Sequence, residues 1–284
     1  YRLYVLGQGV SLTGTWIQQV AMSWLVYRLT GSPALLGAAV FASQIPMLFL
    51  APVAGVFADR LDKRRVVLAT QVLLLFQAAA LAVLSHYDMV RIWHVFVLNF
   101  FFGVVNSFDM PTRQSMVADM IERKEDLAVA IAFMSGVVNV TRLVGPAVAG
   151  IVIASFGEAV CFLVNALSFL AVIVSLLLIR FPPRPARAPR PAGGHFREGL
   201  AYAFGFSPIA HILALLAVTS LVGMPYTVLM PIFADGLIGG GARTLGFLSV
   251  CSALGALTAS VYLASRDSVR GLLRRIAACT AVFG

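Results

Sequence analysis

Charged residues are scarce in this chain of 284 residues. Asp, Glu, Lys and Arg together make up 12% of the sequence, whereas 60% of the residues are hydrophobic and the mean hydropathy is +0.92. A soluble domain of this length cannot remove so much apolar surface from water, so the composition excludes a soluble globular protein. It predicts an integral membrane protein that has lipid as its solvent.

The sequence also lacks the residue patterns of several classes of functional site, which excludes those functions. The three cysteines, Cys161, Cys251 and Cys279, lie far apart in apolar segments, which excludes a disulfide framework and a cysteine metal site. The histidines are scattered without metal-ligand spacing, and the sequence has no Gly-x-x-x-x-Gly-Lys-(Ser/Thr) element to bind a nucleotide. No catalytic dyad is present either. The sequence therefore predicts a protein that is not an enzyme, uses no metal or other cofactor and is not driven directly by ATP.

The chain contains several long apolar segments. A helix needs roughly 20 mostly apolar residues to cross the hydrocarbon of a bilayer. Eight segments meet this requirement, at about 3–27, 33–58, 66–85, 92–112, 127–155, 158–179, 208–233 and 244–264. A ninth begins near residue 276, and because the chain also lacks an initiator Met we expect it to be a fragment.

The basic residues predict the orientation of these helices. The net charge of +9 does not indicate nucleic acid as a partner, because the bases lie in short loops between apolar segments. If the amino terminus is cytoplasmic, 17 of the 21 Lys and Arg residues lie at inner ends, and only Arg28, Arg91 and Arg243 lie at outer ends. Cytoplasmic loops are enriched in Lys and Arg. We therefore expect a multi-pass protein of the plasma (inner) membrane whose amino terminus is cytoplasmic.

A basic, Pro-rich segment from Pro182 to Gly194 divides the chain. It has no apolar periodicity, which is typical of an extended linker. We expect an amino-terminal half of six helices over residues 1–180, a cytoplasmic linker over 181–207 and a partial carboxy-terminal half over 208–284. A weak repeat favours two related halves, because Leu36-Gly37 and Leu245-Gly246 each open a helix that is followed by an Arg-Arg pair.

The loop after the second apolar segment carries the most specific motif. It reads Gly55-Val-Phe-Ala-Asp59-Arg60-Leu-Asp62-Lys63-Arg64-Arg65. The pattern Gly-x-x-x-Asp-Arg-x-x-(Arg/Lys)-(Arg/Lys) resembles the signature loop between helices 2 and 3 of the major facilitator superfamily. The resemblance implies an all-α membrane protein with the major facilitator fold of two six-helix halves. This chain would hold about eight complete helices and the start of a ninth.

Other segments extend the resemblance. Gly145-Pro146-Ala147-Val148-Ala149-Gly150 resembles the Gly-Pro-x-x-Gly-Gly element of antiporters in the superfamily, with Ala149 in place of the first Gly of the final pair. The resemblance makes Gly145, Pro146 and Gly150 the expected hinge of helix 5. The segments 14–18, 108–114 and 139–146 are similar to those of enterobactin (siderophore) exporters and other drug–proton antiporters of the superfamily.

The resemblance also implies a conformational latch at the cytoplasmic face. Its expected members are Gly55, Asp59, Arg60, Arg64, Arg65 and Asp109. Asp109 lies just inside the cytoplasmic end of its helix, where contact of a carboxylate with lipid is costly, so we expect it to pair with an Arg of this loop. A solvated loop that only sets topology, and an interfacial Asp near water, are the alternatives. Asp62 stands where the family often has Gly, and we expect it to pair with Lys63 or Arg65.

Polar residues inside the helices predict a substrate cavity. Arg142 lies about 13 residues, or roughly 20 Å, from the cytoplasmic edge, so it should face a polar cavity and bind an anionic group or a carboxylate. Three helices contribute polar faces, and the expected substrate-binding residues are Gln8, Ser11, Thr15, Gln18, Asn99, Asn106, Asn139 and Arg142. Polar bonds between helices and a structural Arg beside Gly145-Pro146 are the alternatives. Asn99 stands where many proton-coupled antiporters have an Arg, which puts proton coupling by that route in doubt.

These features together predict a secondary active transporter that works by alternating access. Resemblance implies an ion-gradient-driven exporter of a siderophore or drug-like compound. The expected partners are a small-molecule substrate, a coupling ion (H⁺) and the lipid bilayer, with no nucleic acid, and the expected state is a monomer. A lysophospholipid or lipid flippase of the same fold, and a non-transporting membrane sensor, are the alternatives.

Overall fold

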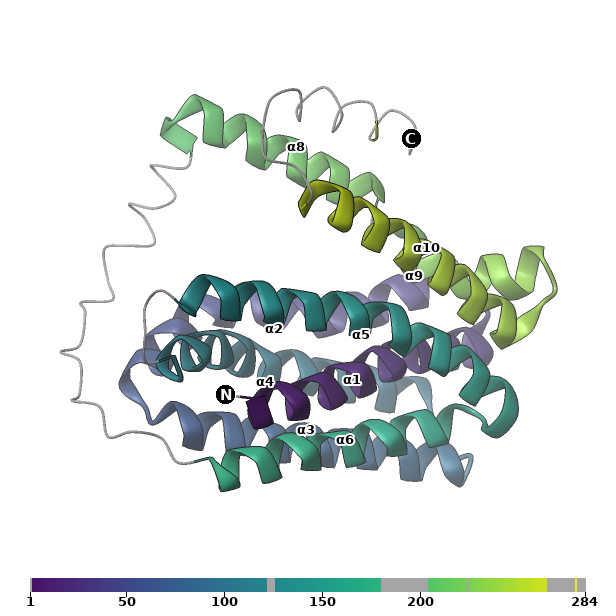
Figure 1. Ribbon diagram of the computed structural model, residues 1–284. Coiled ribbons are helices and arrows are strands. Elements are labelled where there is room, and N and C mark those ends of the chain that lie inside the picture. Colours follow the sequence, from purple (N-terminus) through teal and green to yellow (C-terminus); the bar gives the residue numbers. More distant parts are fainter. Residues whose placement is uncertain (1, 122–125, 180–203, 224, 265–278, 280–284) are drawn as a thin grey trace.

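Helices make up the regular structure of the chain (Figure 1). The computed structural model describes residues 2–121, 126–179, 204–223, 225–264 and 279, and all the regular elements among them are helical. The first six are α1 (Arg2–Thr30), α2 (Pro33–Arg60), α3 (Lys63–His86), α4 (Ile92–Asp119), α5 (Asp126–Phe156) and α6 (Glu158–Leu178). They are followed by α8 (Ser207–Gly223), α9 (Pro225–Pro231), the π-helix η1 (Ile232–Leu237) and α10 (Gly241–Ala264). The predicted all-α class is confirmed.

The helices follow the predicted apolar segments closely. Seven spans are long and apolar enough to cross a membrane among the described residues, and α1 is not one of them because of its polar residues. The predicted end of the fourth segment near residue 112 is wrong, because α4 continues through Pro111 to Asp119. Thr112 Oγ1 donates to Phe108 O at 2.6 Å beside this proline. Pro111 has no N–H to donate to Ser107 O, but α4 continues past it, and membrane helices tolerate such an interruption.

The seventh apolar segment forms three helical pieces instead of one. α8 is followed by the short α9, which holds Pro225 and Pro231, and then by the six-residue η1. Proline removes a backbone donor and clashes with the preceding turn, which explains why a regular α-helix does not run the whole length. A π-helical turn marks a local irregularity of the kind often found at functional sites.

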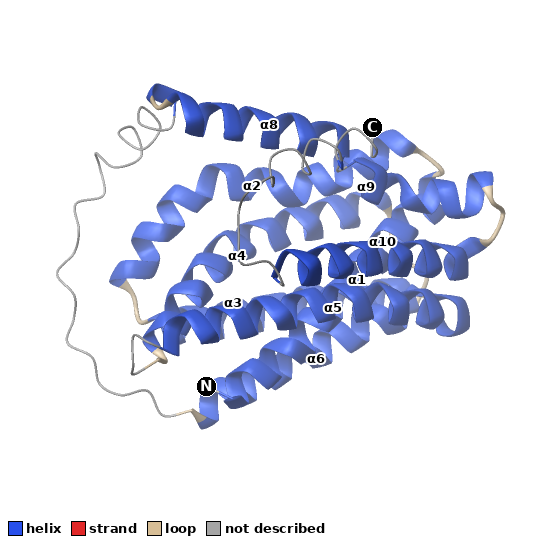
Figure 2. Ribbon diagram, turned by 45° about the horizontal axis from the view of Figure 1, so that its top comes forward, coloured by secondary structure: helices blue, strands red, loops and turns tan. Residues whose placement is uncertain are grey.

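The first six helices form one bundle whose core runs along its length (Figure 2). Within it, α2 packs on α4, α3 packs on α6, and α1 packs on α5 and α6. The core has three clusters, centred on Leu25, Val95 and Phe162, on Leu74, Val105 and Phe169, and on Tyr4, Met116 and Leu176. Many large apolar side chains remain exposed on the outside, as lipid contact requires.

Short connections join successive helices of the bundle and determine their relative direction. Asp62 caps α3, since its side chain accepts from the backbone N–H groups of Arg64 and Arg65. A single residue, Gly157, joins α5 to α6 with a φ of 81°, a conformation that favours glycine. These short links force neighbouring helices to run in opposite directions, as successive membrane spans must.

The later helices meet the bundle on the side formed by α2 and α5 (Figure 1). α10 crosses α5 where two glycines touch: a Cβ built on Gly150 would lie 2.5 Å from the Cα of Gly246. α9 contacts α1 and α2, whereas α8 is exposed along most of its length and diverges from the bundle. The predicted linker lies mostly within residues 180–203, outside the described part of the chain.

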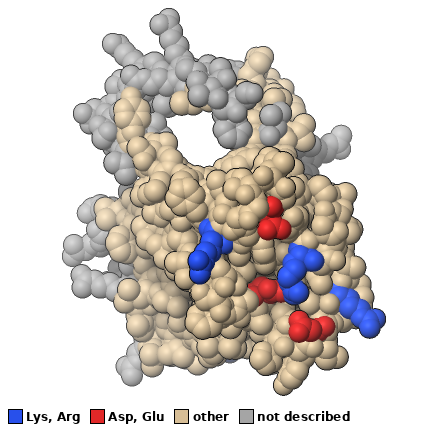
Figure 3. Space-filling view, turned by 90° about the vertical axis from the view of Figure 1, so that its right-hand side faces the viewer, with Lys and Arg blue, Asp and Glu red and all other residues tan. Residues whose placement is uncertain are grey.

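The end of the molecule at which α1 and η1 finish carries few charges (Figure 3). Arg28, Arg91 and Arg243 lie at this end, together with Asp88, Glu158 and Asp235. Arg28 forms an ion pair with Glu158 and thereby joins the end of α1 to the start of α6. These three bases are the ones that the charge asymmetry assigns to the outer face.

Candidate functional site

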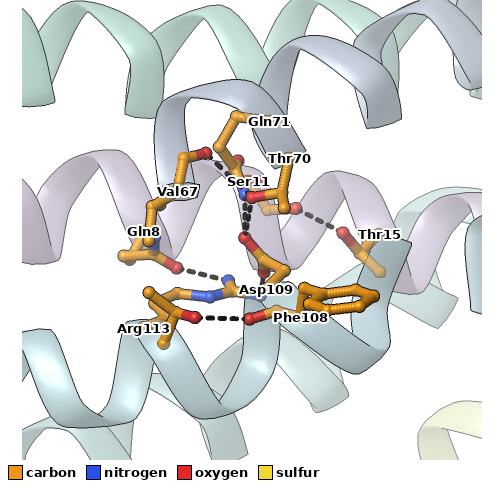
Figure 4. Close-up of polar contacts among 10 residues, drawn as sticks. Gln8, Ser11, Thr15, Val67, Thr70, Gln71, Phe108, Asp109 and Arg113 are labelled. Carbon is orange, nitrogen blue, oxygen red and sulfur yellow. Dashed lines mark hydrogen bonds and ion pairs between the residues drawn. The ribbon is translucent and has the colours of Figure 1, made fainter. Parts of the chain in front are cut away.

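A fully buried carboxylate lies between α3 and α4 (Figure 4). The Oδ1 atom of Asp109 accepts hydrogen bonds from Thr70 Oγ1 at 2.7 Å and from Gln71 Nε2 at 2.9 Å, while Oδ2 forms an ion pair with Arg113 one turn further along α4. The prediction that Asp109 pairs with an Arg of the loop after α2 is therefore wrong for the contacts that the structure describes. The longer α4 explains the difference, because it places Arg113 at the i+4 position of the same helix.

Arg113 connects this carboxylate to α1. Its Nη1 atom donates to Gln8 Oε1 at 2.7 Å, and its side chain is 20% exposed. Gln8 itself is buried. Asp109, Arg113 and Gln8, with Thr70 and Gln71, form one polar cluster that ties together α1, α3 and α4; we call it the Asp109 cluster. It lies at the end of the bundle that the charge asymmetry predicts to be cytoplasmic.

The loop residues of the expected latch form other contacts. Arg64 Nη2 donates to Leu177 O at 3.2 Å, in the last turn of α6. Asp62 pairs with Arg65 at 3.4 Å, as expected, and Lys63 Nζ pairs with Asp119 Oδ2 at 2.7 Å. The expected latch members Gly55, Asp59 and Arg60 belong to the last turns of α2, and their side chains lie outside the described part of the chain. The latch as a whole stays a prediction.

The polar face of α1 is turned largely into the bundle. Gln18 Nε2 donates to Gln77 Oε1 at 3.1 Å, and Asn165 Nδ2 donates to Gln18 Oε1 at 2.7 Å. Ser11 is buried, and Thr15 Oγ1 donates to the Ser11 carbonyl at 2.9 Å. Gln8 and Gln18 thus form polar bonds between helices, which was the alternative to a cavity lining. On α4, Asn99 is buried and Asn106 is half-buried.

Arg142 has a different environment. It is exposed on α5, and its guanidinium carbon lies 5.6 Å from the centroid of the Trp16 ring on α1. None of the ion pairs formed by described residues includes Arg142. A guanidinium over an aromatic ring keeps its N–H edges free to bind an anion. Asn139, three residues earlier on α5, is half-buried.

The glycines of the expected hinge hold α5 against two other helices. A Cβ on Gly145 would lie 2.4 Å from the Cβ of Trp16, so close contact with α1 requires glycine there. Gly150 makes the corresponding contact with Gly246 of α10. α5 continues without interruption through Pro146. The structure therefore shows close helix packing at these residues, and their role as a hinge stays a prediction.

The sequence reasoning missed Thr70, Gln71, Arg113 and Trp16 as site residues. A signal existed for three of them. Thr70 and Gln71 are adjacent polar residues in an otherwise apolar span, and Arg113 follows Asp109 by four residues. Trp16 had no such signal, because its role depends on the crossing of α1 and α5.

Comparison with known proteins establishes the class. A family described as "Transmembrane secretion effector" matches residues 1–282, and the proteins similar to the chain are membrane transporters of one superfamily. The chain belongs to the major facilitator superfamily, and within it to this family. The predicted membership is confirmed.

Three relatives illustrate the range of the family. The chain is 25% identical to the staphyloferrin A transporter of Staphylococcus aureus, over 88% of this chain and 63% of that protein. It is 21% identical to macrolide efflux protein A of Streptococcus pyogenes, over 98% of this chain and 75% of the relative. It is 28% identical to the multidrug efflux pump Tap of Mycolicibacterium fortuitum, over 90% of this chain and 66% of the relative. The chain thus spans about two thirds of the length of these relatives.

Proposed function

We propose that the protein is a secondary active exporter of a small organic molecule with an anionic group, driven by the proton gradient across the plasma membrane. The observation that carries this proposal is Arg142, an exposed guanidinium in the middle of a membrane helix whose described contact is the ring of Trp16. Charge at this depth is costly, so such residues mark substrate and ion pathways. The relatives named as a macrolide efflux protein and a multidrug efflux pump support export, and the relative named as a staphyloferrin A transporter supports transport of a small organic molecule.

The packing of the later helices supports alternating access. α10 touches α5 at the Gly150–Gly246 contact near one end of the bundle, whereas α8 diverges from the bundle toward the end that holds the amino terminus (Figure 1). Close contact at one end and separation at the other is the arrangement expected when two halves rock around a central site. With the proposed orientation, the separated end faces the cytoplasm.

The proposal is tested by an efflux screen. Cells that carry the full-length protein, and matched cells that carry the Arg142→Gln variant, are loaded with staphyloferrin A, a macrolide, a cationic dye and a labelled lysophospholipid. We expect faster efflux of an anionic compound from the wild-type cells, and its loss when the proton gradient is collapsed. Movement of the lysophospholipid alone would contradict the proposal and favour a lipid flippase.

We also propose that the amino terminus and the linker are cytoplasmic. In a background without native cysteines, a single Cys is placed at Ala188 in the predicted linker or at Ile238, which directly follows η1 and is 60% exposed. An impermeant thiol reagent added to intact cells should label position 238 and leave position 188 unlabelled until the cells are opened. Labelling of position 188 but not of 238 would reverse the orientation.

A further inference from the structure

Two hydroxyl groups join α9 to α10 in the later part of the chain. Tyr226 Oη and Ser252 Oγ share a hydrogen bond of 2.7 Å, and we call these two residues the hydroxyl pair. Tyr226 is 37% exposed and Ser252 is half-buried. Polar groups that face lipid lose their hydrogen bonds to water, so an accessible hydroxyl pair within apolar spans indicates a surface that does not face lipid.

The hydroxyl pair has a counterpart in the bundle. Arg142 of α5 lies over the Trp16 ring of α1, so each of the two pairs joins neighbouring helices of its own part of the chain. The same four helices also contact one another between the two parts, because α9 packs on α1 and α10 packs on α5. The two pairs therefore belong to one ring of four helices, with α1 and α5 on one side and α9 and α10 on the other.

The contact between η1 and α1 gives the depth of Tyr226. A Cβ built on Gly236 would lie 3.5 Å from Tyr27 Oη, so these two residues share one level near the end of the bundle where α1 finishes. Tyr226 lies ten residues before Gly236, roughly 15 Å by helical rise. Trp16 lies eleven residues before Tyr27, which is roughly the same distance. Val228 packs against the core cluster that α1 helps to form, so α9 follows α1 over this length and Tyr226 lies at a similar depth to Trp16.

The glycine contact between α5 and α10 gives the depth of the other two residues. Gly150 touches Gly246, and the two helices run in opposite directions there. Arg142 lies eight residues before Gly150, roughly 12 Å by helical rise. Ser252 lies six residues after Gly246, roughly 9 Å toward the same end of the molecule. Two separate helix contacts therefore place both pairs in one layer, within about one helical turn of each other.

We propose that Tyr226 and Ser252 bind substrate and form the second wall of the site to which Arg142 belongs. This inference rests on the proposed export of an organic anion, and it specifies the class of that anion. Arg142 binds the negative group, and its planar donors suit a carboxylate or another oxyanion. The hydroxyl pair bonds a second polar group of the same molecule, because hydroxyl groups both donate and accept. The substrate is therefore an organic anion that carries a hydroxyl or carbonyl group on the side opposite its charge.

A bond that only holds α9 against α10 is the alternative role of the hydroxyl pair. The bundle shows what such a bond looks like, since Gln18 and Gln77 join α1 to α3 and are 5% and 2% exposed. Tyr226 is far more exposed than either of them. Its accessibility and its depth beside Arg142 and Trp16 favour a role in binding.

The first test asks whether the two walls face the same space, and it needs no substrate. Purified full-length protein without native cysteines carries Ser252→Cys and is treated with two methanethiosulfonate reagents of similar size, one with a sulfonate and one with a quaternary ammonium group. The charge of Arg142 should attract the anionic reagent to this thiol and repel the cationic one. We therefore expect Arg142→Gln to lower the ratio of the anionic to the cationic rate at least about threefold at low ionic strength.

Ile238→Cys provides the matched control for the reagent test. Ile238 is 60% exposed and directly follows η1, twelve residues beyond Tyr226, or roughly 18 Å by helical rise. Arg142→Gln should leave the ratio of the two rates unchanged at this position. A thiol at position 252 that reacts with neither reagent, or a ratio there that Arg142→Gln does not lower, overturns the inference.

The second test measures recognition by efflux. Cells that carry the full-length wild type, Tyr226→Phe or Ser252→Ala are loaded with staphyloferrin A or a macrolide, the compounds for which two relatives are named. Each variant removes one neutral hydrogen bond to bound substrate, so KM should rise about 2- to 10-fold for an exported compound. The kcat should stay within about twofold of the wild-type value, because the lost bond is present before and during transport. A lower kcat with an unchanged KM would indicate a structural role and contradict the inference.

The two tests separate this inference from the proposed function. Export by the wild type with an unchanged KM in both variants leaves the proposed function standing and removes the second wall. Export of neither compound by the wild type counts against the proposed function. The reagent ratio at position 252 still decides in that case whether the two walls face one space.

Discussion

Arg142→Gln is expected to weaken substrate binding by about 10- to 150-fold. Hydrogen bonds to a charged group contribute about 1.5–3 kcal/mol, and each 1.4 kcal/mol is a factor of ten in affinity. Gln keeps a polar side chain on α5 but loses the charge and the forked donor geometry that bind an anionic group bidentately. Binding of the compound identified in the efflux screen to purified, folded full-length protein is the deciding measurement.

Arg142→Lys tests whether substrate binding depends on the positive charge alone or also on the planar donor geometry of Arg. Lys keeps the positive charge and loses the planar donors and the stacking on Trp16, which lies 5.6 Å from the guanidinium carbon. We therefore expect binding intermediate between that of the wild type and that of Arg142→Gln. Trp16→Phe keeps a ring under the cation and serves as the matched control. Unchanged affinity in a well-folded Arg142→Gln variant would remove Arg142 from the site. If neither Arg142 variant folds, Arg142 has a structural role and is not shown to bind substrate.

The helices were predictable because lipid imposes one simple rule. Every backbone group in the hydrocarbon must be bonded within its own helix, so the length and hydropathy of a segment are enough to locate a span. The predicted segments 33–58, 127–155 and 158–179 correspond to α2, α5 and α6 within a few residues. The rule fails at the water boundary, where α4 continues through Pro111 to Asp119.

Contacts between side chains were less predictable, because they depend on how far each helix extends and on which face it turns to its neighbours. Asp109 was correctly expected to be paired, since an isolated carboxylate there is too costly, but its partner came from its own helix. The polar residues of α1 were correctly placed on one face. That face is turned mostly toward α3, α4 and α6, a choice that the periodicity of a single helix cannot make.

Polar side chains have two different roles in this bundle. Gln8 and Gln18 are buried and bonded across helices, so they hold the bundle of α1 to α6 together. Arg142 lies on the part of the bundle where α1 and α5 cross, and its described contact is a ring face, which leaves its donors available. Site residues in this fold are therefore better sought among polar groups with unused bonding capacity than among polar groups in general.

Gly150→Leu is expected to reduce transport at least about tenfold while leaving insertion into the membrane intact. A Cβ on Gly150 would lie 2.5 Å from Gly246 Cα and 3.2 Å from Ala242 O, which are backbone atoms that cannot turn aside. The larger side chain must push α10 away from α5 and thereby disfavour the state in which these helices touch. A change of about 1–3 kcal/mol in a two-state balance alters populations by about 5- to 150-fold. Gly246→Leu should have the same effect, because it enters the same contact from the other helix.

Two other glycines of the same helices provide the matched controls. A Cβ on Gly136 of α5 or on Gly255 of α10 would meet nothing within 4 Å. Leu at either position adds the same volume to the same helix without entering the contact, so transport should stay within about twofold of the wild type, as for other substitutions at open positions.

The measurement is efflux at matched expression, with surface labelling to count inserted protein. If Gly150→Leu transports as well as Gly136→Leu, the contact between α5 and α10 is not part of the transport cycle. If all four variants fail alike, leucine in these helices impairs the protein generally and the specific role of the glycine contact is contradicted. A loss confined to Gly150→Leu and Gly246→Leu is the result that an alternating contact between the two halves requires.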